Sequence, residues 1–282
     1  MQNLPLTPSF DSFEEKASKG NLIPVYAELS ADYETPISVY QKICDGQFSF
    51  LLESAESTDR AGRFSFIGSD PRSVIEARGP NIKISKGNEV DEFQSECGDP
   101  LKELEVFMSS YLPVSVSGLP VFYGGAIGYL SYDAVRYFEP TINEPANDDL
   151  GLPDMVFMIT QNVVIFDHRL RKLLIVSNIF TEEGEELQTL YDNASKEIGK
   201  IIQKLDRSLD FRPLIKGVKT DSVKYKSNTS KNEYYDMVNK AKEFIHSGDA
   251  FQIVLSQRFE IDFPGTPIDL YRALRSVNPS PY

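Results

Sequence analysis

Short apolar runs separated by polar turns fill the first 180 residues, and this pattern predicts β-strands interrupted by brief helices. A largely buried strand is expected over 48–55 (FSFLLESA), because the run is too short and too continuously apolar for an amphipathic helix. A second strand follows over 62–68 (GRFSFIG). SVIEARG and NIKISKGNEV predict an antiparallel pair that turns near Gly79. MVFMIT, NVVIFDH and KLLIVSNI predict further strands, the last two forming a hairpin within a meander.

Helix signals punctuate these strands. Thr-Pro at 35–36 and Asp-Pro at 99–100 each provide a capping residue followed by proline at the first helical position. Residues 121–133, which contain three glycines, look like a strand with a close backbone approach. The apolar stripe over 183–205 predicts a long amphipathic helix.

The last segment begins with a capping box formed by Ser230 and Glu233, and the helix that it opens should end at Gly248. Strict alternation of apolar residues over 251–263 then predicts a long half-buried strand. A final helix should run from Thr266-Pro267 to Val277.

The chain is expected to contain two domains. The charge-rich, aperiodic stretch 206–228 is interpreted as a linker between a first domain, 1–205, and the start of a second, 229–282. The two helices and the strand of the second segment carry more apolar surface than they can cover for themselves. We therefore expect the chain to be the N-terminal fragment of a longer protein.

Composition narrows the functional classes. A 41% hydrophobic, 25% charged chain is not a disordered protein. Its 29 basic and 42 acidic residues give a net charge of −13, which disfavours binding to nucleic acids or anionic membranes. The two cysteines, the lack of a signal-peptide pattern and the lack of an apolar run of about 20 residues predict a soluble, cytoplasmic protein.

No catalytic constellation or metal-ligand motif stands out, so we assign neither catalytic nor metal residues. The GGAIG sequence at 124–128 lacks the lysine of a phosphate loop and is interpreted as tight sheet packing. His168 and His246 have no companion serine, cysteine or second ligand at a useful spacing, which favours structural roles.

One segment fits an amino-acid pocket. Glu53 and Ser54 end a buried strand, where a carboxylate could accept from an ammonium group and a hydroxyl could bind either ligand terminus. Arg63 nearby could recognise a carboxylate in bidentate fashion. The alternative interpretation is an ordinary strand end whose polar groups contact water. The chemistry of these residues, taken by itself, favours this alternative. The terminal Pro281-Tyr282 fits either a rigid connector or a preformed ligand wall.

Several long motifs occur in the order found in the large subunit (component I) of anthranilate synthase, within the chorismate-utilising enzymes. They are LLESAESTDRAGRFSFIG, GGAIGYLSYD, VVIFDH, GDAFQIVLSQRF and NPSPY, and the similarity runs from about Leu22 to Tyr282. The resemblance implies an α+β fold in which antiparallel β-sheets pack as a sandwich with helices outside.

The resemblance also implies an activity: a lyase that converts chorismate and ammonia to anthranilate and pyruvate in tryptophan biosynthesis, with Mg²⁺. A glutamine amidotransferase subunit (component II) would supply the ammonia. Matching positions would place Ser54, Pro281 and Tyr282 in a feedback site for L-tryptophan, with Glu53 and Arg63 beside them. The family's catalytic and Mg²⁺-binding motifs follow NPSPY, so none is assigned here, and this chain alone should be inactive.

Two alternatives stay open. Aminodeoxychorismate synthase component I, from the folate pathway, carries a similar tryptophan pocket. A non-enzymatic amino-acid-binding module would instead be monomeric, unfold cooperatively and be stabilised by L-tryptophan.

Overall fold

The computed structural model describes residues 4–53, 62–139, 141–142, 148–209, 223–280 and 282. The chain divides into two compact units, one formed by Met1–Asp210 with Pro279–Tyr282 and the other by Phe211–Asn278. The assignment of 1–205 to a regulatory domain, 206–228 to a linker and 229–282 to the start of a chorismate-binding domain stays a prediction. The last four residues group with the first unit rather than with the segment before them.

The first unit is built on two five-stranded antiparallel sheets. The first sheet has the order β1-β10-β9-β3-β2, with β1 at Leu22–Ser30, β2 at Ser49–Glu53, β3 at Phe64–Ser69, β9 at Asn162–Asp167 and β10 at Lys172–Phe180. The β9–β10 hairpin confirms the sequence prediction. The second strand, β2, lies at an edge of this sheet.

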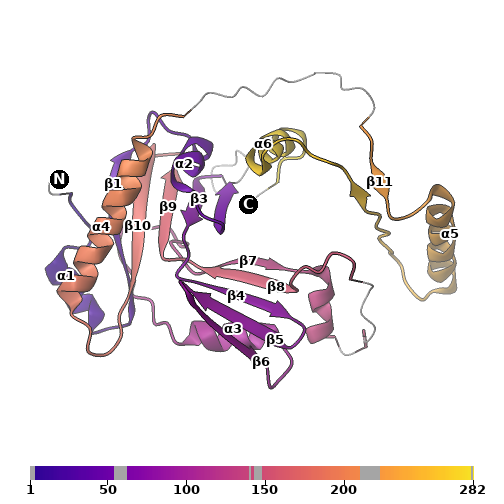
Figure 1. Ribbon diagram of the computed structural model, residues 1–282, viewed down its shortest axis with the longest axis horizontal. Coiled ribbons are helices and arrows are strands. Elements are labelled where there is room, and N and C mark those ends of the chain that lie inside the picture. The colour runs from indigo at the N-terminus through magenta and orange to yellow at the C-terminus, as the bar shows by residue number, and fades with distance from the viewer. Residues whose placement is uncertain (1–3, 54–61, 140, 143–147, 210–222, 281) are drawn as a thin grey trace. The chain divides into compact units, whose positions relative to one another are not determined.

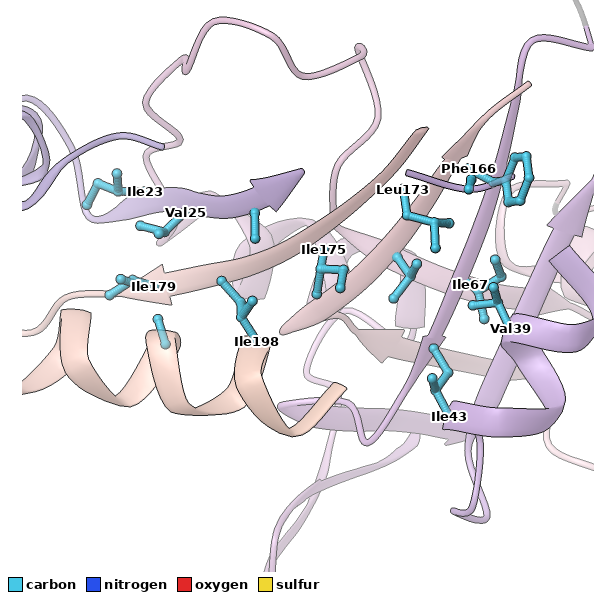
Figure 2. Close-up of a cluster of buried hydrophobic side chains, with 14 of the residues drawn as sticks. Ile23, Val25, Val39, Ile43, Ile67, Phe166, Leu173, Ile175, Ile179 and Ile198 are labelled. Atoms are coloured by element: carbon cyan, nitrogen blue, oxygen red, sulfur yellow. The ribbon is translucent and has the colours of Figure 1, made fainter. Parts of the chain in front are cut away.

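Three helices cover one face of the first sheet: α1 (Phe10–Ala17), α2 (Pro36–Ile43) and α4 (Leu187–Leu205). Figure 2 shows the hydrophobic core between these helices and the sheet, where Ile198 of α4 faces Ile175 and Ile179 of β10. Phe13, Ile23, Ile175 and Ile198 have no exposed surface. The opposite face of the sheet carries a second, aromatic cluster that includes Phe50, Phe66 and Phe122.

The second sheet has the order β6-β5-β4-β8-β7, with β4 at Ser73–Arg78, β5 at Asn81–Lys86, β6 at Glu89–Gln94, β7 at Ala126–Leu130 and β8 at Met155–Ile159. Helix α3 (Pro100–Ser109) packs Leu101, Leu104 and Met108 against its buried residues. A 3₁₀ helix follows β7 over Tyr132–Tyr137. The expected α+β fold of antiparallel sheets with helices outside is confirmed.

The predicted caps form. Thr35 and Ser38 bond each other's backbone at the start of α2, and Asp99 caps α3. In the second unit, Ser230 and Glu233 close the capping box of α5 (Lys231–Ser247), and Thr266 caps α6 (Pro267–Val277).

Three strand predictions need correction. The expected strand over 251–263 is wrong: only β12 (Phe259–Glu260) forms, and it pairs with the two-residue β11 (Lys226–Ser227). An alternating pattern becomes a strand only when neighbouring strands satisfy its backbone, and the described residues of this unit supply just this pair. The strand expected over 121–133 shortens to β7, because the backbone before it bends at Gly125. MVFMIT forms β8, which joins the second sheet rather than continuing the meander.

Candidate effector site

Tyr282 lies at the β2 edge of the first sheet, beside the end of that strand. The backbone N–H of Tyr282 donates to the carbonyl of Glu53 at 3.0 Å, and its hydroxyl donates to the carbonyl of Phe64 at 3.3 Å. Its ring centroid lies 6.1 Å from that of Phe66. All these residues belong to the first unit. Two of the predicted site residues, Glu53 and Tyr282, are therefore in direct contact.

Strand register divides the site between the two faces of the sheet. Glu53 pairs with Ser65 across β2 and β3, and Phe64 pairs with Asp167 across β3 and β9. Directly opposed residues share a face, and successive residues alternate. The Glu53 side chain thus lies on the helix-covered face with Ser65, whereas Phe64 and Asp167 lie on the aromatic face.

Arg63 belongs to the aromatic face. Its guanidinium carbon lies 4.7 Å from the centre of the Phe64 ring. Asp167 accepts hydrogen bonds from Arg63 Nε at 3.2 Å and from Nη2 at 2.7 Å. Arg63 is therefore held in an ion pair, with 34% of its side chain exposed against 5% for Asp167.

The carboxylate of Asp167 also caps the β9–β10 turn, because its Oδ1 accepts from the backbone N–H groups of Arg169 and Leu170. Burial by itself would raise the pKa of Asp167. The hydrogen bonds from Arg63 and from the turn outweigh that effect, and the pKa lies below its ordinary value. Asp167 is therefore an ionised partner of Arg63 at neutral pH.

His168 has a serine companion that sequence spacing did not reveal. Its Nε2 lies 2.8 Å from Oγ of Ser65, and its backbone N–H donates to the carbonyl of Arg63 at 2.9 Å. Burial lowers the pKa of His168, and the charges of Glu53 and Asp167 partly oppose this. Ser65 is 1% exposed, so the pair does not present a nucleophile to solvent. His168 is therefore not assigned a catalytic role.

Two predicted residues, Ser54 and Pro281, lie outside the described part of the chain. Of the other three, Glu53 offers its main-chain carbonyl to Tyr282, and Arg63 and Tyr282 line the aromatic face. Sequence reasoning missed Phe64, Phe66 and Asp167. They lie within the motifs GRFSFIG and VVIFDH, but only the pairing of β3 with β9 brings those motifs together.

The glycine motif has the packing role that the sequence favoured. A Cβ on Gly124 would lie 2.4 Å from Nδ2 of Asn178, and one on Gly128 would lie 1.8 Å from the carbonyl oxygen of Val156.

Neither a metal site nor a membrane span emerges from the described residues. They contain no group of three or more His, Cys, Asp or Glu side chains placed to hold an ion. No helix among them is both long and apolar enough to cross a bilayer.

Comparison with known proteins agrees with the fold and the motifs. The family model for chorismate binding enzymes matches residues 47–282. Anthranilate synthase component 1 of Synechocystis sp. is 37% identical and that of Aquifex aeolicus 36% identical, each over 98% of this chain. The crystal structure of anthranilate synthase component I from Streptococcus pneumoniae TIGR4 superposes with a TM-score of 0.61 at 28% identity, over 90% of this chain and 53% of that one.

The family match extends over most of the chain, so the chain belongs to the chorismate binding enzyme family. It spans 56% of the length of the Synechocystis relative and 55% of that of the Aquifex relative.

Proposed function

We propose that this chain is part of the large subunit of an anthranilate synthase. The whole enzyme would add ammonia to the ring of chorismate, with loss of water and pyruvate, and release anthranilate for tryptophan biosynthesis in the cytoplasm. A partner glutamine amidotransferase would supply the ammonia, and Mg²⁺ would stabilise charge on the substrate's carboxylate and leaving group. The relatives named anthranilate synthase component 1, similar over nearly the whole chain, support this proposal.

The part of the enzyme described here would carry the feedback site for L-tryptophan. The single observation that carries this proposal is the docking of Tyr282 onto the end of β2 and the start of β3. It places the Tyr282 ring beside the Phe66 ring, and the Tyr282 hydroxyl on the carbonyl of Phe64, the residue that follows Arg63. An indole can stack against such rings, and a guanidinium can bind the amino-acid carboxylate.

Inhibition would then follow from a shift in populations. L-Tryptophan bound between the β2–β3 end and the Tyr282 segment would stabilise the docked position of that segment. If the enzyme binds chorismate poorly when this segment is docked, L-tryptophan lowers activity by binding the docked state more tightly than the undocked state.

The chain itself offers a direct binding assay, because it contains no tryptophan. The indole fluorescence of added L-tryptophan, excited beyond tyrosine absorption, reports binding through its anisotropy. We expect saturable binding that the Tyr282→Ala variant weakens by about fivefold, the loss of one aromatic contact. Tyr235→Ala is the matched control, because Tyr235 is also 53% exposed but lies in α5. Equal affinity in all three proteins would count against the site.

The reaction needs a separate test with the full-length enzyme. Chorismate, ammonia and Mg²⁺ should yield fluorescent anthranilate and pyruvate. Accumulation of aminodeoxychorismate without pyruvate would assign the protein to the folate pathway instead. L-Tryptophan binding with no turnover of chorismate by the full-length protein would favour a non-enzymatic binding module.

A further inference from the structure

We infer that Asp167 and His168 are positioning residues of the effector site, which together aim one edge of the Arg63 guanidinium at the carboxylate of a bound amino acid. This inference rests on the proposed tryptophan site and adds the part of the chain that organises it. Neither residue was predicted to belong to that site.

Asp167 fixes which edge of the guanidinium is available. A guanidinium has five N–H groups, and two of its edges can each grip a carboxylate with parallel hydrogen bonds. Asp167 occupies the edge formed by Nε and Nη2. Among the described residues it is the only hydrogen-bond partner of that side chain, so the edge formed by Nη1 and Nη2 is left for a second carboxylate. The Arg63 side chain as a whole is 34% exposed to solvent.

His168 forms hydrogen bonds with the residues on both sides of Phe64. Its N–H holds the carbonyl of Arg63, and its imidazole meets the hydroxyl of the buried Ser65. Phe64 between them provides the ring under the guanidinium and the carbonyl that accepts from Tyr282. The two adjacent residues at the end of β9 therefore fix both the charged and the aromatic wall of the site.

Preorganisation of this kind improves binding because the side chain loses less freedom when the ligand arrives. The effect of preorganisation on binding can be distinguished by experiment from the effect of simple charge attraction. Removing the negative charge of Asp167 makes the site more positive, which by Coulomb attraction alone would tighten the binding of a carboxylate. Positioning predicts the opposite sign, weaker binding, and the sign decides between the two effects.

The test compares L-tryptophan with tryptamine, which lacks the carboxylate, on the full 282-residue chain by indole anisotropy. Asp167→Asn keeps an oxygen for the turn N–H groups but loses the ion pair. We expect it to weaken L-tryptophan binding about tenfold, a coupling of ordinary size for contacting charged groups, and to leave tryptamine binding unchanged. In the Arg63→Ala background the same substitution should have no further effect. Glu182→Gln, which removes the partner of Arg72 elsewhere in the unit, is the matched control.

Two variants of His168 provide a second test, which does not depend on whether Asp167→Asn folds. His168→Ala should lower L-tryptophan affinity about threefold, and His168→Gln, whose amide can still reach Ser65, should restore it. Unchanged or tighter L-tryptophan binding by Asp167→Asn would overturn the inference, as would an equal loss for tryptamine. Those results would leave the proposed function standing if the unmodified chain binds L-tryptophan. Failure of the unmodified chain to bind would overturn the proposed effector site, and the inference with it.

Discussion

Gly124 offers a quantitative test of the packing role of the glycine motif. A Cβ there would lie 2.4 Å from Nδ2 and 3.2 Å from Cγ of Asn178, and 3.1 Å from Oγ1 of Thr160. The Asn178 side chain cannot simply retreat, because it is 2% exposed and its Nδ2 donates to the carbonyl of Tyr123 at 3.1 Å. Gly124→Ala must therefore displace a buried, hydrogen-bonded amide.

The expected cost has two parts. Overpacking a well-filled interior costs about 1–3 kcal/mol, and leaving a buried donor without its acceptor costs about 1–3 kcal/mol more. We expect Gly124→Ala to lower the free energy of unfolding by roughly 2–6 kcal/mol, measured by urea denaturation with far-UV circular dichroism.

Gly199→Ala is the control for this experiment. Gly199 lies within α4, and a Cβ there would meet no atom within 4 Å, so alanine should stabilise the helix by about 1 kcal/mol. If Gly124→Ala unfolded within about 0.5 kcal/mol of the unmodified chain, the close approach to Asn178 would not be what requires glycine.

Two further outcomes follow from titratable groups. Burial raises the pKa of the Cys44 thiol to about 12, whereas Cys97 is exposed. At pH 8 a thiol reagent should therefore label Cys97 rapidly and Cys44 only as the protein unfolds. Equal labelling rates for the two cysteines would contradict the burial of Cys44. The pKa of Asp167 is lowered in the folded state, so the stability it contributes is present above the ordinary aspartate pKa of about 4 and is lost as pH falls through the lowered value. Unfolding of the unmodified chain and Asp167→Asn should thus differ by about 2 kcal/mol at pH 7 and converge in strong acid, whereas a difference independent of pH would exclude the ion pair as its source.

Local signals in the sequence predicted the elements that local chemistry determines. The proline-started helices α2, α3 and α6, the capping box of α5 and the β9–β10 hairpin depend on residues a few positions apart. The alternating segment 251–263 failed as a strand because alternation describes which face is apolar, not whether a neighbouring strand exists to pair with it. Phe251 is consequently 96% exposed.

The candidate site was only partly predictable for the same reason. Glu53 was proposed from its chemistry and Tyr282 from a resemblance between motifs, and the backbone hydrogen bond that joins them links residues far apart in the sequence. The ion pair of Arg63 with Asp167 depends on the register of β3 against β9, which no local pattern specifies. Register also puts the Glu53 carboxylate on the helix-covered face, whereas the Tyr282 ring lies beside Phe66 on the aromatic face.

The central claim is that L-tryptophan binds where Tyr282 meets the ends of β2 and β3, and a crystal structure of the chain with L-tryptophan tests it most directly. We predict an indole within about 4 Å of the Tyr282 and Phe66 rings, with its carboxylate on the open edge of Arg63. An indole bound elsewhere, with Tyr282 still docked on an empty β2 end, would contradict the account.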